Sequence, residues 1–275
     1  MSAQKGYDMR NHPWLGAMKP FRLLGNTWFV GLKQASTHLI DTGAGLILLD
    51  SGYQESIYFV LDSIYQCGFS PYDIKYIIHS HGHIDHAAAT RALTELTGAE
   101  TFIGEGEREM VNGTRPELTW GPEYDMPFNG TFEPDHLLRD GDRITLGNTV
   151  IDCVATPGHT AGTFSFFWNI EDGGRIFRAG MMGGAGLNSM KADYLKKYAL
   201  PVDEWRGAFG SSIERCRQEK VDVFIGNHAN QNDTPGRCER LFAGDRLAFY
   251  DPEAWGRFLD LCQTRLEKLN AEDPL

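Results

Sequence analysis

The stretch that decides the fold is His79-Ser80-His81-Gly82-His83-Ile84-Asp85-His86, which holds four of the nine histidines in the chain. The residues just before it, Ile74-Lys75-Tyr76-Ile77-Ile78, are mostly apolar and β-branched, which predicts a short buried strand. The segment from Ala87 to Thr97 is rich in alanine and carries apolar residues at helical spacing, so we expect a helix there. The histidines therefore lie in the turn between a strand and a helix, where their side chains can converge on one point.

The side chains of this turn are suited to hold metal ions. His81 and His83 are two residues apart in extended chain and point the same way. Asp85 and His86 supply a second pair of ligands at the start of the helix. Imidazole nitrogen and carboxylate oxygen bind zinc at roughly 2.0–2.2 Å. Helix capping would explain Asp85 but none of the histidines, and we expect His79, at the strand end, to pack or hydrogen-bond rather than to bind metal.

The pattern His81-x-His83-x-Asp85-His86 resembles the signature of the metallo-β-lactamase superfamily. Within it, the pattern is most similar to the third lactamase subclass, whose ligands are all histidine or aspartate. A cage for two metals needs further ligands, and two later histidines each follow an apolar, strand-like run. One is His159 in Thr156-Pro157-Gly158-His159-Thr160, which is similar to the Pro-Gly-His-Thr segment of the family, and the other is His228.

The resemblance implies that the chain is an enzyme that binds two zinc ions in two sets of three ligands. The first set is His81, His83 and His159, and the second is Asp85, His86 and His228. A hydroxide shared by two metals about 3.5–4 Å apart would attack a carbonyl, and Asp85, as the catalytic residue, would orient it and take its proton. The implied reaction is hydrolysis of an amide or lactam bond, as in a metallo-β-lactamase.

Three alternatives stay open. A hydrolase of lactones or thioesters would share every ligand and differ only in the shape of its pocket. An iron-dependent oxidoreductase of the same superfamily is disfavoured, because its flavodiiron branch has glutamate where His83 stands and no flavin-binding domain follows here. A zinc protein without catalytic activity is also disfavoured, because six ligands on two metals leave open positions for water.

Two further segments bear on the site. Asp50, followed by Ser51-Gly52, matches an Asp-x-Gly of the family that lies under the metals, so we expect it to support a ligand rather than to bind metal. Gly180 or Met181 stands where most dinuclear members have a metal-bridging aspartate, so the second zinc is expected to bind more weakly than the first. Met181 and Gly183 also replace serines that hold the substrate carboxylate in the lactamases, which leaves recognition of lactams open.

The remaining pattern predicts a mixed sheet with helices outside. The chain begins with hairpins over 21–24, 27–30, 37–40 and 46–50, an antiparallel start. Later strands are expected at 100–103, 150–155, 162–168, 175–179 and 221–225, and helices at 53–67, 105–111, 203–219 and 252–269. The resemblance sharpens this α/β pattern to a four-layer αββα sandwich. Because the ligands span residues 81 to 228, we expect one metallo-hydrolase domain over 1–275.

Two loops could line the mouth of the site. Residues 113–135 contain four prolines and no periodicity, which predicts a long surface loop. Its Trp120, Tyr124 and Phe128 could contact a substrate, although packing of the loop is the expected role. Asn230, Gln231 and Asn232 follow His228 and could bind a polar substrate or simply form a solvated loop.

Composition narrows the class of partner to small molecules. With 41% hydrophobic residues the chain is globular, and its formal charge of −11, with no cluster of lysine and arginine, argues against nucleic acid. The sequence contains no run of about 18 apolar residues, so no membrane span is predicted. The polar residues 1–20 do not resemble a secretory signal. Five scattered cysteines favour reduced thiols and a cytoplasmic location, unless an export leader has been removed. The sequence carries no signal for the oligomeric state.

Overall fold

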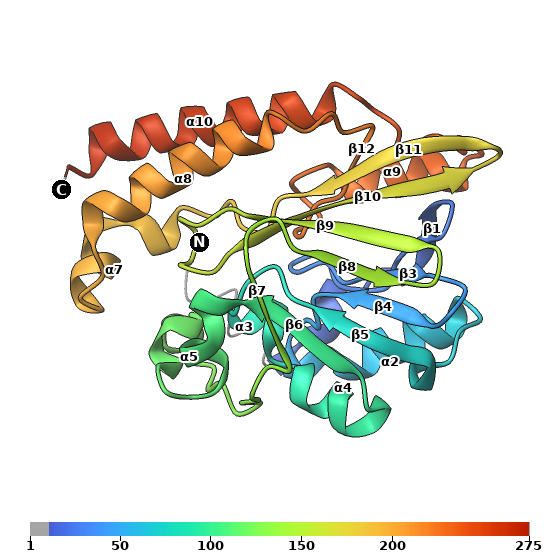
Figure 1. Ribbon diagram of the computed structural model, residues 1–275, viewed down its shortest axis with the longest axis horizontal. Helices are drawn as coiled ribbons and strands as arrows, with labels where there is room; N and C mark the ends of the chain where they lie inside the picture. The colour runs from blue at the N-terminus through green and yellow to red at the C-terminus, as the bar shows by residue number, and fades with distance from the viewer. Residues whose placement is uncertain (1–10, 275) are drawn as a thin grey trace.

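Two β-sheets stacked face to face form the centre of the computed structural model, which describes residues 11–274 (Figure 1). The first sheet holds seven strands in chain order: β1 (Phe21–Leu24), β2 (Thr27–Phe29), β3 (His38–Asp41), β4 (Leu46–Leu49), β5 (Ile74–Ile78), β6 (Glu100–Gly104) and β7 (His136–Leu138). The strands β1 to β4 pair antiparallel, as predicted, and β4 to β7 pair parallel. The carboxyl ends of the parallel strands, including β5, therefore lie at one edge of this sheet.

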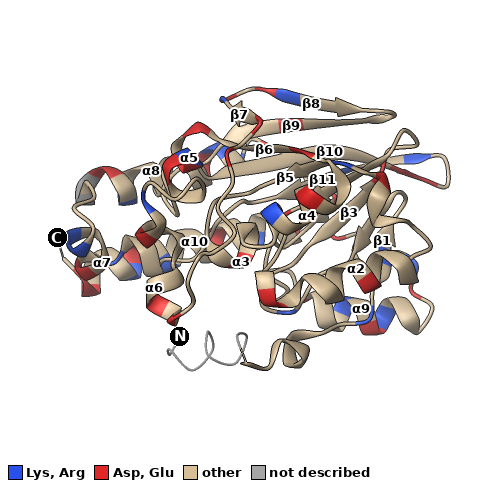
Figure 2. Cartoon of the chain, turned by 90° about the horizontal axis from the view of Figure 1, so that it is seen from below, with Lys and Arg blue, Asp and Glu red and all other residues tan. Residues whose placement is uncertain are grey.

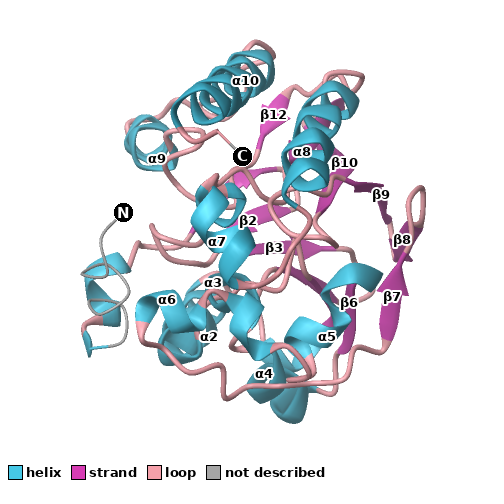
Figure 3. Cartoon of the chain, turned by 90° about the vertical axis from the view of Figure 1, so that its left-hand side faces the viewer, coloured by secondary structure: helices cyan, strands magenta, loops and turns pink. Residues whose placement is uncertain are grey.

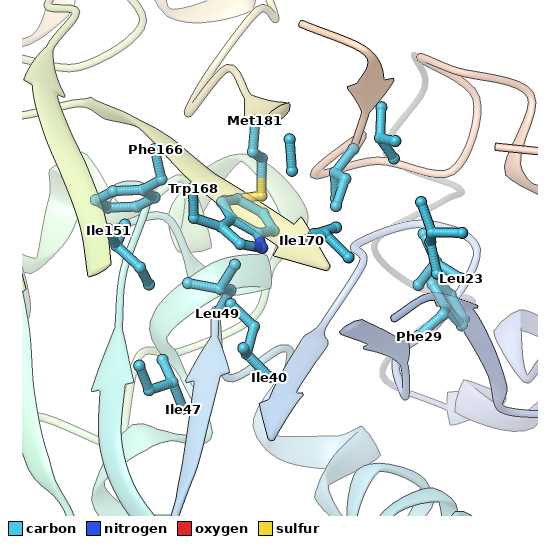
Figure 4. Packing of buried hydrophobic residues seen from close by; sticks show 14 of the residues in the cluster. Leu23, Phe29, Ile40, Ile47, Leu49, Ile151, Phe166, Trp168, Ile170 and Met181 are labelled. Atoms are coloured by element: carbon cyan, nitrogen blue, oxygen red, sulfur yellow. The ribbon is translucent and has the colours of Figure 1, made fainter. Parts of the chain in front are cut away.

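The second sheet has five strands in the order β12-β11-β10-β9-β8. They are β8 (Arg143–Leu146), β9 (Thr149–Ala155), β10 (Phe164–Asp172), β11 (Arg175–Met181) and β12 (Val223–Phe224). Fully buried side chains fill the space between the sheets, among them Ile151, Phe166 and Trp168 from this sheet and Ile40 and Leu49 from the first (Figure 4). This packing fixes the loop after β5 relative to the loop after β9, and the two loops carry His81 and His159.

Helices cover the outer face of each sheet (Figures 1 and 3). The helices α2 and α4 pack on the first sheet, and α8 and α10 pack on the second. The predicted four-layer αββα fold is therefore confirmed. The helices are α2 (Ile57–Gln66), α3 (Ile84–Ala87), α4 (Thr90–Thr97), α5 (Arg108–Val111), α6 (Gly121–Tyr124), α7 (Ala192–Lys197), α8 (Val202–Cys216), α9 (Thr234–Phe242) and α10 (Ala254–Glu272). Short 3-10 turns cover Pro13–Gly16, Gln54–Ser56, Pro71–Asp73, Glu105–Glu107, Pro116–Thr119 and Asn188–Met190.

The predicted helix over 87–97 is interrupted. The backbone N–H of Ser51 donates to the carbonyl of His86 at 2.8 Å, and that of Ala89 donates to the carbonyl of Gly52 at 3.2 Å. These bonds to the loop after β4 replace helical ones, so α3 ends at Ala87 and α4 begins at Thr90.

Other boundaries differ from the predicted ones as well. The predicted strand 221–225 shortens to the two-residue β12, and the closing helix begins and ends later than 252–269. The predicted loop 113–135 contains a 3-10 turn and α6, and the predicted helix 105–111 is a 3-10 turn followed by α5. The elements β7, β8, α7 and α9 were not predicted from the sequence.

Over residues 11–274, no helix is long and apolar enough to cross a membrane. Acidic and basic segments are interspersed on the side of the molecule in Figure 2. The prediction that residues 1–20 are not a secretory signal falls partly on residues 1–10, outside the described residues.

Candidate metal centre

The histidine-rich loop of residues 79–86 begins where β5 ends, at the edge of the molecule where α3, α6 and α7 gather (Figure 3). Asp50, which follows β4 with a φ of 59°, lies beneath this loop. Its carboxylate accepts hydrogen bonds from the N–H of Ser80 at 2.7 Å, the hydroxyl of Ser80 at 2.8 Å and Nδ1 of His86 at 2.7 Å. Asp50 thus holds the loop in place and orients His86 so that Nε2 faces away from the core.

Three of the histidines meet as one group. The ligand atoms of His81, His83 and His159 lie within 4.8 Å of one another, and Nε2 of His81 is 3.2 Å from Nε2 of His159. Nδ1 of His159 donates to the carbonyl of Gly186 at 2.7 Å, so its Nε2 carries a lone pair. Nε2 of His83 is buried and has no hydrogen-bond partner within the described residues.

A second group lies beside the first. Oδ2 of Asp85 is 3.4 Å from Nε2 of His86 and 3.6 Å from Nε2 of His228, and the two nitrogens are 3.3 Å apart. Nδ1 of His228 donates to the carbonyl of Gln34, which fixes Nε2 as the free nitrogen. His81 also lies within 4.8 Å of Asp85 and His86, so it stands between the two groups.

The electrostatics keep the histidines of the first group neutral, whereas His86 of the second group favours a proton that a metal would replace. Burial, reinforced by neighbouring histidines, holds the pKa of His81 and His83 well below the usual value, and burial lowers the pKa of His159 to about 4. Burial also opposes protonation of His86, but Asp85 and Asp50 raise its pKa to about 10. Burial alone would raise the pKa of Asp85, yet His86, His228 and His83 lower it below its usual range.

The Nε2 lone pairs of His81 and His159, which face each other across 3.2 Å, repel unless a cation lies between them. The buried Nε2 of His83, which has no hydrogen-bond partner within the described residues, also indicates a bound cation. A set of imidazole nitrogens with one carboxylate is the donor set that zinc takes, so the residues present fit that metal. All six predicted ligands are brought to this one place.

The predicted exception, His79, lies apart from both groups. Its Nε2 is 2.6 Å from the hydroxyl of Thr90 and its Nδ1 is 3.1 Å from the carbonyl of Phe102. Both ring nitrogens are therefore satisfied, and the expectation that His79 hydrogen-bonds is confirmed.

A cavity of about 300 Å³ opens over the two groups and is lined by His83, Asp85, His159 and His228. Of the predicted loop aromatics, Trp120 and Tyr124 line its wall, but Phe128 packs into two small apolar clusters instead. Asn230 and Gln231 also line the cavity. Asn232 does not, because its amide donates to the carbonyl of Phe224 at 2.8 Å.

Residues 181, 183 and 184, at and just after the end of β11, carry no side chain into the cavity. Met181 is 1% exposed and packs between the sheets (Figure 4). A Cβ on Gly183 would lie 1.8 Å from the carbonyl oxygen of Phe164, and one on Gly184 would lie 2.4 Å from the ring of His159. Within residues 11–274, Asp85 is the only carboxylate that lines the cavity, so no bridging aspartate is present.

Replacing Gly184 with alanine is therefore expected to displace the ring of His159. We expect the free energy of unfolding to fall by about 1–3 kcal/mol through overpacking, and metal uptake to weaken. Urea unfolding and metal titration measure both quantities. Gly207→Ala is the control, since no atom lies within 4 Å of its added Cβ. Wild-type metal affinity in Gly184→Ala would show that this close packing does not orient His159.

Sequence reasoning missed several contributors to the site, including Asn188 and Ser189 of the cavity lining. Phe258 and Arg265 reach the cavity from α10, a helix that was expected only to pack on the core. Glu107 is fully buried and accepts hydrogen bonds from the N–H of Gly82 at 2.7 Å and of Gly162 at 2.6 Å. The sole sequence signal was the spacing of Phe258 and Arg265, seven residues apart on one face of a helix.

Comparison with known proteins places this geometry in a family. The family model described as the metallo-beta-lactamase superfamily matches residues 30–173, more than half of the 275-residue chain. The chain belongs to the metallo-β-lactamase superfamily. Family, fold and His/Asp cluster together confirm the predicted enzyme of the metallo-β-lactamase type.

Solved metallo-β-lactamases match nearly the whole chain. It is similar to native FEZ-1 metallo-β-lactamase from Legionella gormanii, with a TM-score of 0.86 and 26% identity over 94% of this chain and 98% of that one. Its fold also matches BJP-1, a subclass B3 metallo-β-lactamase of Bradyrhizobium japonicum, with a TM-score of 0.82 and 23% identity over 96% and 97% of the two chains. The predicted likeness to the third subclass is confirmed.

Among curated relatives, an uncharacterised protein of Mycobacterium leprae is 33% identical over 96 residues. The match covers 33% of this chain and 43% of the relative, so the chain spans less than half the length of that relative.

Proposed function

We propose that the chain is a dinuclear zinc hydrolase that cleaves a carbonyl bond of the amide or lactam type in a small molecule. The observation that carries the proposal is the pair of facing Nε2 lone pairs of His81 and His159, 3.2 Å apart, beside a second group in which Nε2 of His86 and Nε2 of His228 lie 3.3 Å apart. One ion would be held by His81, His83 and His159, and the other by Asp85, His86 and His228. Bound zinc supplies a hydroxide near neutral pH and polarises a carbonyl oxygen.

The side chains of the protein do the remaining work. Asp85, kept charged by the surrounding histidines, accepts a hydrogen bond from the attacking water, orients it and receives its proton. Trp120, Tyr124 and Phe258 form an apolar wall that limits water around the reacting carbonyl. Asn230 and Gln231 offer amide groups to polar parts of the substrate. No serine or cysteine nucleophile is required.

A substrate panel tests the reaction class. Zinc-loaded protein should hydrolyse at least one of nitrocefin, a homoserine lactone and a lactoyl thioester, and chelation should abolish that activity. A preference for the lactone or thioester would replace the lactam proposal within the same metal centre. Loss of all activity on the panel, or iron as the dominant bound metal, would contradict the proposed function.

Unequal affinity of the two sites is a further expected result. Because no carboxylate bridges the groups within the described residues, one zinc should bind more tightly than the other. Competition with a chelator, followed by elemental analysis, should give a species with one zinc per chain before the species with none. Release of both ions in one step would contradict this prediction.

We further propose that residues 1–275 act as one domain. A cytoplasmic location is also proposed, and it is supported by the five free cysteines, four of which are buried. Fractionation of the source cells tests the location.

A further inference from the structure

Two buried arginines set this molecule apart from its otherwise exposed basic surface. Within residues 11–274, Arg206 on α8 and Arg237 on α9 are the only buried lysines or arginines, with 4% and 9% of their surface exposed. A guanidinium loses its hydration on burial, so it is stable there only when its N–H groups find acceptors inside the protein. Both arginines find them in the same way, with Nε on the carbonyl of a loop and the outer nitrogens on an aspartate and a second carbonyl.

The Arg206 clasp, formed by Arg206, Met190 and Asp273, holds the loop that follows β11. Nε of Arg206 donates to the carbonyl of Met190 at 2.8 Å, and Nη1 and Nη2 donate to the carbonyl and to Oδ2 of Asp273 at 2.7 and 2.8 Å. Oδ2 of Asp273 also accepts from the N–H of Ala192 at 2.8 Å. The clasp therefore ties this loop to α8 and to the C-terminal end of α10, at the end of the molecule where α7 lies (Figure 1).

The loop that this clasp holds contacts His159 at its ring and at its backbone. Nδ1 of His159 donates to the carbonyl of Gly186 at 2.7 Å, and the hydroxyl of Ser189 donates to the carbonyl of His159 at 2.6 Å. Ser189 directly precedes Met190, so a shift of Met190 displaces the groups that orient His159. The direction of Nε2 of His159 thus depends on the Arg206 clasp.

The Arg237 clasp, formed by Arg237, Asn232 and Asp251, holds the loop that carries His228. Nε of Arg237 donates to the carbonyl of Asn232 at 2.7 Å, and Nη2 donates to Oδ2 of Asp251 at 3.0 Å. The side-chain amide of Asn232 donates in turn to the carbonyl of Phe224 at 2.8 Å, at the end of β12. His228 lies in the chain between Phe224 and Asn232, so the clasp and this bond hold both ends of its loop.

We propose that each clasp positions one metal ion by holding the loop at one ligand. The Arg206 clasp acts on the first ligand group through His159. The Arg237 clasp acts on the second ligand group through His228. The proposal rests on the proposed function, because it takes each group to bind one ion. Both arginines are positioning residues, since neither is among the described residues that line the cavity.

Arg206→Lys and Arg237→Lys test the clasps, because lysine keeps the charge but its single nitrogen lacks the planar fork that bonds a carbonyl and a carboxylate at once. Chelator competition measures the two zinc dissociation constants. Cadmium NMR of the cadmium-loaded proteins shows which group has changed, since three nitrogens and two nitrogens with one oxygen give different chemical shifts. We expect Arg206→Lys to weaken zinc binding roughly tenfold in the first group only, and Arg237→Lys to do so in the second group only.

The two variants control for each other, because a general loss of stability would weaken both groups in either protein. Arg217→Lys is a further control, since Arg217 directly follows α8 and joins it to α10 through Asp260 at 2.7 Å. It should leave both zinc affinities unchanged. Asp273→Asn and Asp251→Asn break each clasp from its other side and should weaken the same group as the matching lysine variant, even if that variant does not fold.

Equal weakening of both groups, or of neither, in the folded variants would overturn the proposal and leave the clasps as packing contacts. Wild type that takes up fewer than two zinc ions would overturn the dinuclear centre and the clasps with it. Selective losses in a protein that hydrolyses nothing on the substrate panel would support the clasps and contradict the proposed reaction alone.

Discussion

Replacing Asp85 with asparagine is expected to lower kcat by about 10²–10⁴ on whichever substrate the panel identifies. The carboxylate lies 3.4 Å from Nε2 of His86 and 3.6 Å from Nε2 of His228, so it belongs to the second ligand group and faces the cavity at once. Asparagine keeps the shape but is neutral, and its amide binds zinc poorly and accepts no proton. Both the second metal and the orientation of the water should therefore be lost.

The measurement combines kcat with zinc content per chain. We expect one zinc, not two, in Asp85→Asn. Asp62→Asn is the control, because Asp62 lies on α2, away from the site, and its carboxylate accepts a hydrogen bond from the side chain of Gln66. A variant that keeps two zinc ions and the wild-type rate would remove Asp85 from both of its proposed roles.

The sequence predicted the part of the site that local geometry decides. His81, His83, Asp85 and His86 are adjacent in a strand–turn–helix segment, so their convergence follows from backbone periodicity alone. His159 and His228 each follow a strand, but only the family resemblance connected them to that segment. Their proximity depends on the register of two sheets, which no local pattern encodes.

The residues of α10 that line the cavity could not be predicted either, because their place also depends on tertiary packing. The apolar stripe of α10 predicts which face of the helix packs on the protein, but it does not say that this face passes a cavity before it ends. Arg265 was therefore not predicted to line the site. Likewise, Met181 was considered in place of a bridging ligand, while the structure turns it into the core between the sheets.

Glu107 joins the two loops that carry the first ligand group, and its replacement should have the largest effect on stability. Oε2 accepts from the N–H of Gly82, between His81 and His83, and Oε1 accepts from the N–H of Gly162, just beyond His159. Glu107→Ala leaves two buried donors without partners, at about 1–3 kcal/mol each. We expect the free energy of unfolding to fall by about 2–6 kcal/mol, a large share of the usual total.

The conservative variant Glu107→Gln tests whether the hydrogen bonds of Glu107 or the packing of the sheets aligns the two loops. In Glu107→Gln one amide oxygen can accept one N–H, but the NH₂ group faces the other donor, so about half of the loss should remain. Because Gly82 shifts, the three-histidine group should also bind zinc more weakly, and urea unfolding with metal titration measures both effects. Glu105→Gln is the control, because Glu105 lies on the same turn but is exposed and makes one long contact, 3.8 Å, with Arg139. It should change neither the stability nor the zinc affinity. If Glu107→Gln matched wild type in stability and zinc affinity, the two loops would be aligned by the packing of the sheets alone.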